Sequence, residues 1–111
     1  MLRESSLANS ISPDIAVVTN PSVDSRVPAG RELVAFTDAM LTGTDDDVAA
    51  ARSAVIDVLG TQEMVEAAAV CACLEMMNRY TLATGIPLSR GRMVRTEEVR
   101  AAAGLDAFHH D

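Results

Sequence analysis

Apolar residues recur at helical spacing through the middle of the chain. Between residues 29 and 59 they return every three or four positions, which places them along one side of each helix, and beyond Thr61 they become nearly continuous. The pattern predicts three helices, over residues 29–41, 44–59 and 61–84. The expected buried stripes are Leu33, Phe36, Thr37, Met40 and Leu41 in the first helix and Val48, Ala51, Val55, Val58 and Leu59 in the second. Because very short loops force neighbouring helices to run antiparallel, we predict an all-α fold, a small helical bundle.

Polar residues and glycine mark the two ends of the second predicted helix. Thr44 stands at the N-cap position, and Asp45, Asp46 and Asp47 fill the first turn, where the positive end of the helix dipole favours carboxylates. Thr44 and Asp47 have the spacing of a capping box. Gly60 is suited to a left-handed position that ends the helix.

The third predicted helix is the longest and the most apolar. Thr61 is its expected N-cap, and Gly85 and Pro87 end it. From Met64 to Met77 the helix is apolar nearly all round, a pattern typical of a helix that is contacted on several sides. We therefore expect this helix to lie at the centre of the bundle.

The chain divides by pattern into an N-terminal segment that is partly irregular (1–28), a helical core (29–88) and a C-terminal segment (89–111). The N-terminal segment offers a helix start at residues 12–14, with Ser12 as its cap, or a short β-strand over residues 15–19. Residues 2–7 offer one further short helical possibility.

The C-terminal segment is predicted to begin with a basic turn, Ser89 to Arg95, which leads into a short helix from Thr96 to near Gly104. The last residues form a loose tail. This tail carries His109 and His110, which lack the further Cys or carboxylate ligands of a metal site. We expect neither a metal nor a cofactor.

Composition and charge exclude several classes of partner. Hydrophobic residues make up 49% of the 111 residues but aromatic residues only 3%, so small aliphatic side chains must build the core. The net charge is −7, and no basic stripe interrupts it, which argues against nucleic acid and against an anionic membrane surface. The longest uncharged apolar run is too short to span a bilayer. With two cysteines outside any disulfide framework and no signal peptide, we expect a cytoplasmic protein.

Several segments, taken in order, resemble the C-terminal half of the carboxymuconolactone decarboxylase/alkylhydroperoxidase D family. The most telling segment is the long apolar helix that ends in Asn78-Arg79 and is followed by Gly85-Ile86-Pro87. The stretch Leu33-Val-Ala-Phe-Thr-Asp-Ala-Met-Leu41 and the acidic cap after it also fit. The resemblance covers about residues 10 to 88 and implies the helical alkylhydroperoxidase D-like fold.

The same resemblance implies that the catalytic segment of the family is missing. Peroxidase-type members carry a Cys-x-x-Cys closely followed by His, upstream of the region matched here, and this sequence contains no such motif. The resemblance therefore assigns no catalytic residue to this chain. It favours a non-catalytic or incomplete helical oligomerising domain, whose partner is a second copy of the chain or a separate catalytic half.

Cys71 and Cys73 form the only pair of thiols. One alternative function is a peroxidase or thiol–disulfide oxidoreductase, an antioxidant activity, that uses these two residues. Positions i and i+2 of a helix point to different sides, however, so a disulfide between them is strained. The opposing interpretation is that both thiols are buried and act as small apolar side chains of the core.

A second group of candidates shares one face near the end of the third helix. Glu75, Asn78 and Arg79 are three or four residues apart, and Tyr80 is adjacent. A lyase-like site would use Glu75 as a base, Arg79 as an anchor for an anion and Tyr80 as a donor. The structural alternative is an intrahelical ion pair between Glu75 and Arg79, which is common at this spacing.

Overall fold

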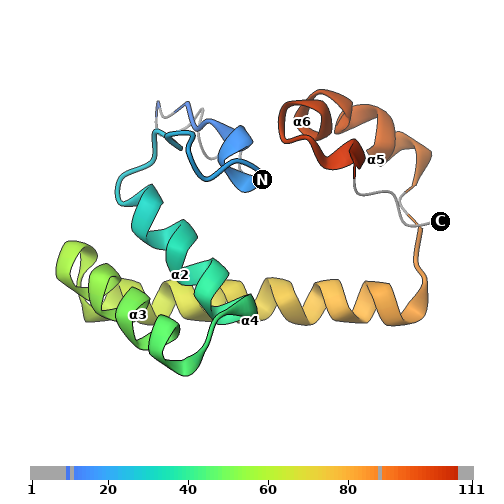
Figure 1. Cartoon of the computed structure of the whole chain (residues 1–111). Helices are drawn as coiled ribbons and strands as arrows, with labels where there is room; N and C mark the ends of the chain where they lie inside the picture. The colour runs from blue at the N-terminus through green and yellow to red at the C-terminus, as the bar shows by residue number, and fades with distance from the viewer. Residues whose placement is uncertain (1–9, 11, 88, 108–111) are drawn as a thin grey trace. The chain divides into compact units, whose positions relative to one another are not determined.

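The computed structural model describes residues 10, 12–87 and 89–107, and these residues form an all-α structure (Figure 1). The predicted fold class, a small all-α helical bundle, is confirmed, and the described residues contain no strand. The alternative β-strand over residues 15–19 is therefore wrong. The elements in chain order are the 3-10 helix η1 (Ile15–Val18), α2 (Gly30–Thr42), α3 (Asp45–Leu59), α4 (Thr61–Thr84), α5 (Arg90–Arg95), α6 (Glu97–Ala102) and the 3-10 helix η2 (Leu105–Ala107).

The chain forms two compact units. The central unit, Arg31–Pro87, holds nearly all of α2 and the whole of α3 and α4. The terminal unit combines Met1–Gly30 with Leu88–Asp111, the two ends of the chain.

The core of the central unit is small. In Figure 1, α3 lies along the first half of α4, and the second half of α4 extends beyond it. Val55 of α3 is fully buried, and Phe36 is 3% exposed, as their places in the predicted stripes require. Leu41 and Val58 were also expected to be buried, but they are 49% and 55% exposed. Three helices without a fourth element cover only the centre of each stripe, so its margins stay open to solvent.

The start of α3 confirms the predicted capping box. The backbone N–H of Asp47 donates to Oγ1 of Thr44 at 3.3 Å, and the backbone N–H of Thr44 donates to Oδ2 of Asp47 at 2.8 Å. These two bonds pair donors that a helix start would otherwise leave free. The hydrogen bond from the Thr44 backbone, followed by the bond from the Thr44 hydroxyl, lowers the pKa of Asp47 below its ordinary value of 3.8.

A single glycine separates α3 from α4. Gly60 ends α3 as predicted, but its φ of 111° and ψ of 169° are outside the left-handed helical region and in one that is accessible essentially to glycine alone. Gly60 is also the N-cap of α4, with no side-chain hydrogen bond, so the prediction that Thr61 is the cap is wrong. The one-residue connection leaves no separate position for a polar cap. At the other end, Gly85 is left-handed, as the sequence indicates.

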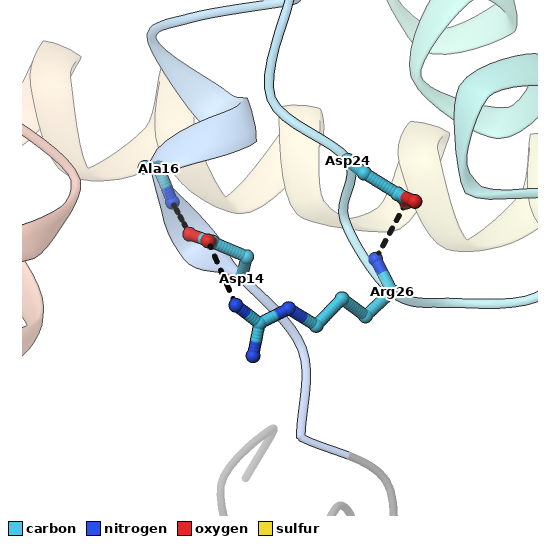
Figure 2. A network of polar contacts seen from close by, with 4 residues as sticks. All are labelled: Asp14, Ala16, Asp24 and Arg26. Atoms are coloured by element: carbon cyan, nitrogen blue, oxygen red, sulfur yellow. Dashed lines mark hydrogen bonds and ion pairs between the residues drawn. The ribbon is translucent and has the colours of Figure 1, made fainter.

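Side-chain caps and one ion pair order the first part of the terminal unit (Figure 2). Asp14 is the N-cap of η1, and its Oδ1 accepts from the backbone N–H of Ala16 at 3.1 Å. Its Oδ2 lies 3.8 Å from Nη2 of Arg26. Asp24 Oδ1 accepts from the backbone N–H of Arg26 at 2.9 Å. Asp14 therefore takes the capping role that we predicted for Ser12.

The segment predicted as a basic turn is the helix α5. Ser89 caps it by accepting from the backbone N–H of Arg92 at 3.3 Å, and the arginines of its last turn face the negative end of the helix dipole. The short helix predicted after it is α6, followed by η2. The two segments of the terminal unit are joined where Oγ1 of Thr19 donates to the carbonyl oxygen of Ala103 at 2.7 Å. Two expectations, a helix over residues 2–7 and a loose tail at His109 and His110, lie outside the described residues.

Candidate functional site

The four candidate residues Cys71, Cys73, Glu75 and Arg79 all lie on α4, and this helix is far less covered than its sequence predicts. None of its 24 residues is buried. The expectation of a central helix that is contacted on several sides is therefore wrong for this chain. The large apolar side chains on α4 that are more than half exposed include Val65 (56%), Val70 (60%), Leu74 (54%), Met76 (64%), Met77 (53%) and Tyr80 (64%).

One side of α4 borders a hollow between this helix and α2. The hollow has a volume of about 450 Å³, and most of its lining is apolar. It is lined by Leu33, Thr37, Leu41, Ala67, Val70, Cys71, Leu74, Glu75 and Asn78. The α4 wall carries Cys71, Glu75 and Asn78, and the α2 wall carries the hydroxyl of Thr37, which donates to the carbonyl oxygen of Leu33 at 2.9 Å. A hollow of this volume is within the range of small-molecule sites.

The two thiols lie on different sides of α4, as their spacing predicts. Cys71 is half-buried and lines the hollow, whereas Cys73 is exposed, and both are free thiols. The interpretation that both are buried in the core is thus wrong for Cys73, because no described helix of the central unit covers that side of α4. The structure does not bring the two sulfurs together for dithiol chemistry.

Glu75 and Arg79 form the predicted intrahelical ion pair. Oε1 of Glu75 lies 2.8 Å from Nε of Arg79. The Glu75 side chain is 31% exposed and lines the hollow, while the Arg79 side chain is 78% exposed. In this geometry the candidate base and the candidate anion anchor neutralise each other. Such an exposed pair contributes little to stability.

Tyr80 does not join these polar groups. It lines a second, smaller hollow of about 260 Å³ together with Met76, Met77 and Thr81. Successive helix residues are 100° apart, so Tyr80 lies about 140° around the helix from Glu75. The sequence analysis missed this second apolar side, because it interpreted an apolar pattern all round the helix as a sign of burial. The signal that reveals it is the spacing of Ala69, Cys73, Met76, Tyr80 and Ala83.

No metal site or membrane span emerges from the part of the chain that the structure describes. Its Cys, Asp and Glu residues form no group of three that could hold an ion. None of its helices combines the length and the apolar character needed to cross a bilayer.

Comparison with known proteins gives no relative. The chain matches no family model, no curated protein and no solved structure. The resemblance to the carboxymuconolactone decarboxylase/alkylhydroperoxidase D family accordingly stays a prediction.

Proposed function

We propose that this chain is a non-catalytic helical oligomerisation domain and that α4 is its interaction helix. The observation that supports this proposal is the exposure of large apolar side chains along α4, none of whose residues is buried. Scattered apolar residues are normal on a protein surface, but a contiguous set along one helix is typical of an interaction site. These side chains are little more than half exposed, so covering one of them contributes roughly 1–2 kcal/mol before the entropic cost of association.

The proposal includes the family that the sequence resembles. A domain equivalent to the C-terminal half of a carboxymuconolactone decarboxylase-like protein would keep the helices that associate and lack the Cys-x-x-Cys-His segment. Its partner would be a second copy of the chain or, as the alternative, a separate catalytic half. The absence of Cys-x-x-Cys from this sequence and the separation of Cys71 from Cys73 support a role without dithiol chemistry.

The test is the solution mass of the untagged, reduced chain, measured by light scattering after size exclusion at several concentrations. We expect a discrete oligomer that does not bind a dye specific for exposed apolar surface. A folded monomer without dye binding would contradict the proposal, because its apolar helix would then need no partner. An aggregating monomer that is stabilised only by a second protein would favour the separate catalytic half.

The exposure of Cys73 favours a second candidate, a thiol peroxidase or thiol–disulfide oxidoreductase. In this case Cys73 would reduce a peroxide and become a sulfenic acid, with an external thiol as the reductant that restores it. Peroxide consumption that depends on added thiol, and that is lost in Cys73→Ser but not in Cys71→Ser, would support this candidate.

The third candidate is lyase-like acid–base chemistry at Glu75 and Arg79. The ion pair between these two residues would have to open before either could act on a substrate. Lactone decarboxylation that is lost in Glu75→Gln and in Arg79→Gln would support it. Under the oligomerisation proposal, we expect no activity above background in either assay.

A further inference from the structure

We propose that α4 pairs with α4 of a second copy in antiparallel orientation, through a seam made of Ala69, Cys73, Met76, Tyr80 and Ala83. This inference rests on the proposed function, which it deepens by naming the partner, the face and the orientation. Neither the face nor the orientation follows from self-association alone.

The seam residues have the spacing of helices that pack side by side. They are separated by four, three, four and three residues, the alternation of the core positions of a heptad. All five are exposed, and Met76 and Tyr80 are each 64% exposed. At 100° per residue they occupy the side of α4 opposite to Ala67, Cys71 and Leu74, which border the α2 hollow. Pairing through the seam therefore leaves the hollow between α4 and α2 unchanged.

The distribution of side-chain size along the seam selects the antiparallel orientation. The small residues Ala69 and Cys73 come first, and the large residues Met76 and Tyr80 follow. An antiparallel pair with its two-fold axis between residues 74 and 75 sets Ala69 opposite Tyr80 of the second copy, and Cys73 opposite Met76. Each layer then combines one small and one large side chain, which fills space evenly. In a parallel pair, Tyr80 would face Tyr80 of the second copy and Ala69 would face Ala69. The tyrosine layer would then be overpacked, and the alanine layer would contain a cavity.

The charges of α4 select the same orientation. The next seam position before Ala69 is Glu66. A parallel pair would set Glu66 directly against Glu66 of the second copy, which is unfavourable. In the antiparallel pair Glu66 lies level with Ala83, and Arg79 of the second copy is one helical turn away, roughly 6 Å along the axis. Arg79 is the one basic residue of α4 and is paired with Glu75, so the acidic start of each helix lies over a half of the other helix that has no net charge, and the repulsion of the parallel pair is avoided.

The available area is sufficient for a dimer. The seam with its exposed neighbours Val65, Ala72 and Met77 offers roughly 600 Å² per copy, or about 1,200 Å² in total, at the lower end of the range for specific interfaces. An interface of this size is consistent with a dimer that dissociates on dilution. The five seam residues span two heptads, so the pair is short and does not form an extended coiled coil.

The first experiment locates the face. Met76→Glu places a charge in the seam, whereas Leu82→Glu places one on the same helix about 140° away from the centre of the seam. Both residues are more than half exposed, at 64% and 79%, so neither change should unfold the chain, which circular dichroism checks. We expect Met76→Glu to raise the dimer dissociation constant at least tenfold and Leu82→Glu to change it less than twofold.

The second experiment determines the orientation. In a Cys71→Ala, Cys73→Ala background, one sample carries Glu66→Cys and another carries Ala83→Cys. The two are mixed and oxidised mildly. In the antiparallel pair residue 66 faces residue 83, while two copies of residue 66 are roughly 25 Å apart along the axis, too far for a disulfide. We expect the mixed disulfide and neither homodisulfide, as judged by intact mass.

The outcomes separate the inference from the function on which it rests. A wild-type chain that is monomeric at every concentration overturns both. If Met76→Glu also destabilises that monomer, another part of the same chain covers the seam. A dimer that survives Met76→Glu but dissociates with Leu82→Glu keeps the proposed function and overturns the seam. Homodisulfides at residues 66 and 83 without the mixed product overturn the antiparallel orientation alone.

Discussion

Asp47 shows how single hydrogen bonds fix the start of a helix in this chain. Its Oδ2 accepts from the backbone N–H of Thr44 at 2.8 Å and from the Thr44 hydroxyl at 2.7 Å. Both bonds favour the charged carboxylate and hold the pKa of Asp47 below its ordinary value. Because the folded pKa is lower than the unfolded one, the interaction contributes fully above pH 3.8, and its contribution is lost as the pH falls through the folded pKa.

We predict that Asp47→Ala lowers the melting temperature at neutral pH and that this difference is smaller at strongly acidic pH, because the wild-type carboxylate becomes protonated as the pH falls through its lowered pKa. Thermal unfolding followed by circular dichroism at the two pH values measures the effect. Thr44→Ala removes one of the donors, so the pKa of Asp47 should rise part of the way toward 3.8 in an NMR titration. A melting difference that is the same at both pH values would contradict this account.

Gly43 is required by the close approach of the chain between α2 and α3. A Cβ atom at this position would lie 2.7 Å from the carbonyl oxygen and 2.9 Å from the Cα of Ala39. Since both are backbone atoms, they cannot rotate away. We predict that Gly43→Ala lowers the free energy of unfolding by roughly 1–3 kcal/mol. Gly91→Ala is the control, because a Cβ at Gly91 meets nothing within 4 Å. It should leave stability unchanged or raise it by about 0.5–1 kcal/mol in urea titrations.

The two cysteines differ in access to solvent, and this difference can be measured directly. In dilute native protein we predict fast reaction of the exposed Cys73 with a thiol reagent and slower reaction of Cys71 on the wall of the hollow. Cys71→Ser and Cys73→Ser assign the two phases. Denaturant should make the two rates equal. Equal rates in the native protein would show that the hollow does not protect Cys71.

At the scale of elements, α3 provides a matched pair of valines. Val55 is fully buried and Val58 is 55% exposed, although the sequence places both in one stripe. We predict that Val55→Ala lowers the free energy of unfolding by about 2 kcal/mol, from lost transfer energy and a residual cavity. Val58→Ala should cost less than about 0.5 kcal/mol. Similar losses at both positions would mean that a partner covers Val58.

The helix α4 differs from the other elements because its two sides have different environments. One side borders α2 and carries Cys71 and Glu75, and the opposite side carries Met76 and Tyr80. In the central unit, the first side is partly covered by neighbouring helices and the second is left open to solvent. Under the proposed function, association with a second copy covers this open side.

At the scale of the whole molecule, self-association links stability to concentration. If folded copies pair through α4 and unfolded chains do not, the dimer is favoured by mass action. We predict that the midpoint of thermal unfolding of the wild type rises with protein concentration, and that this dependence is lost in Met76→Glu. A midpoint independent of concentration in the wild type would contradict association at those concentrations. Calorimetry over a concentration series makes the comparison.

Local sequence patterns were enough to predict where helices form in the middle of the chain and where they end. The spacing of Phe36 and Val55, the capping box of Thr44 and Asp47, and the left-handed Gly85 all act within a few residues, so periodicity and local hydrogen bonding are enough to find them. The ion pair between Glu75 and Arg79 was predictable for the same reason, since one turn of a helix brings the two residues together. The helix α5 was missed because its arginines and Gly91 were interpreted as a turn.

Which parts of each apolar stripe are covered depends on how the helices pack against one another, and the sequence pattern does not show this. Val58, Leu41 and Cys73 are exposed although the sequence predicts that they are buried. A side chain is covered only where another element packs over it, and the pattern along one helix does not show how many neighbours that helix has. The same reason explains why an all-round apolar helix was predicted as central although none of its residues is buried. The hydrogen bond between Thr19 and Ala103, which joins the two segments of the terminal unit, likewise links residues that are distant in sequence.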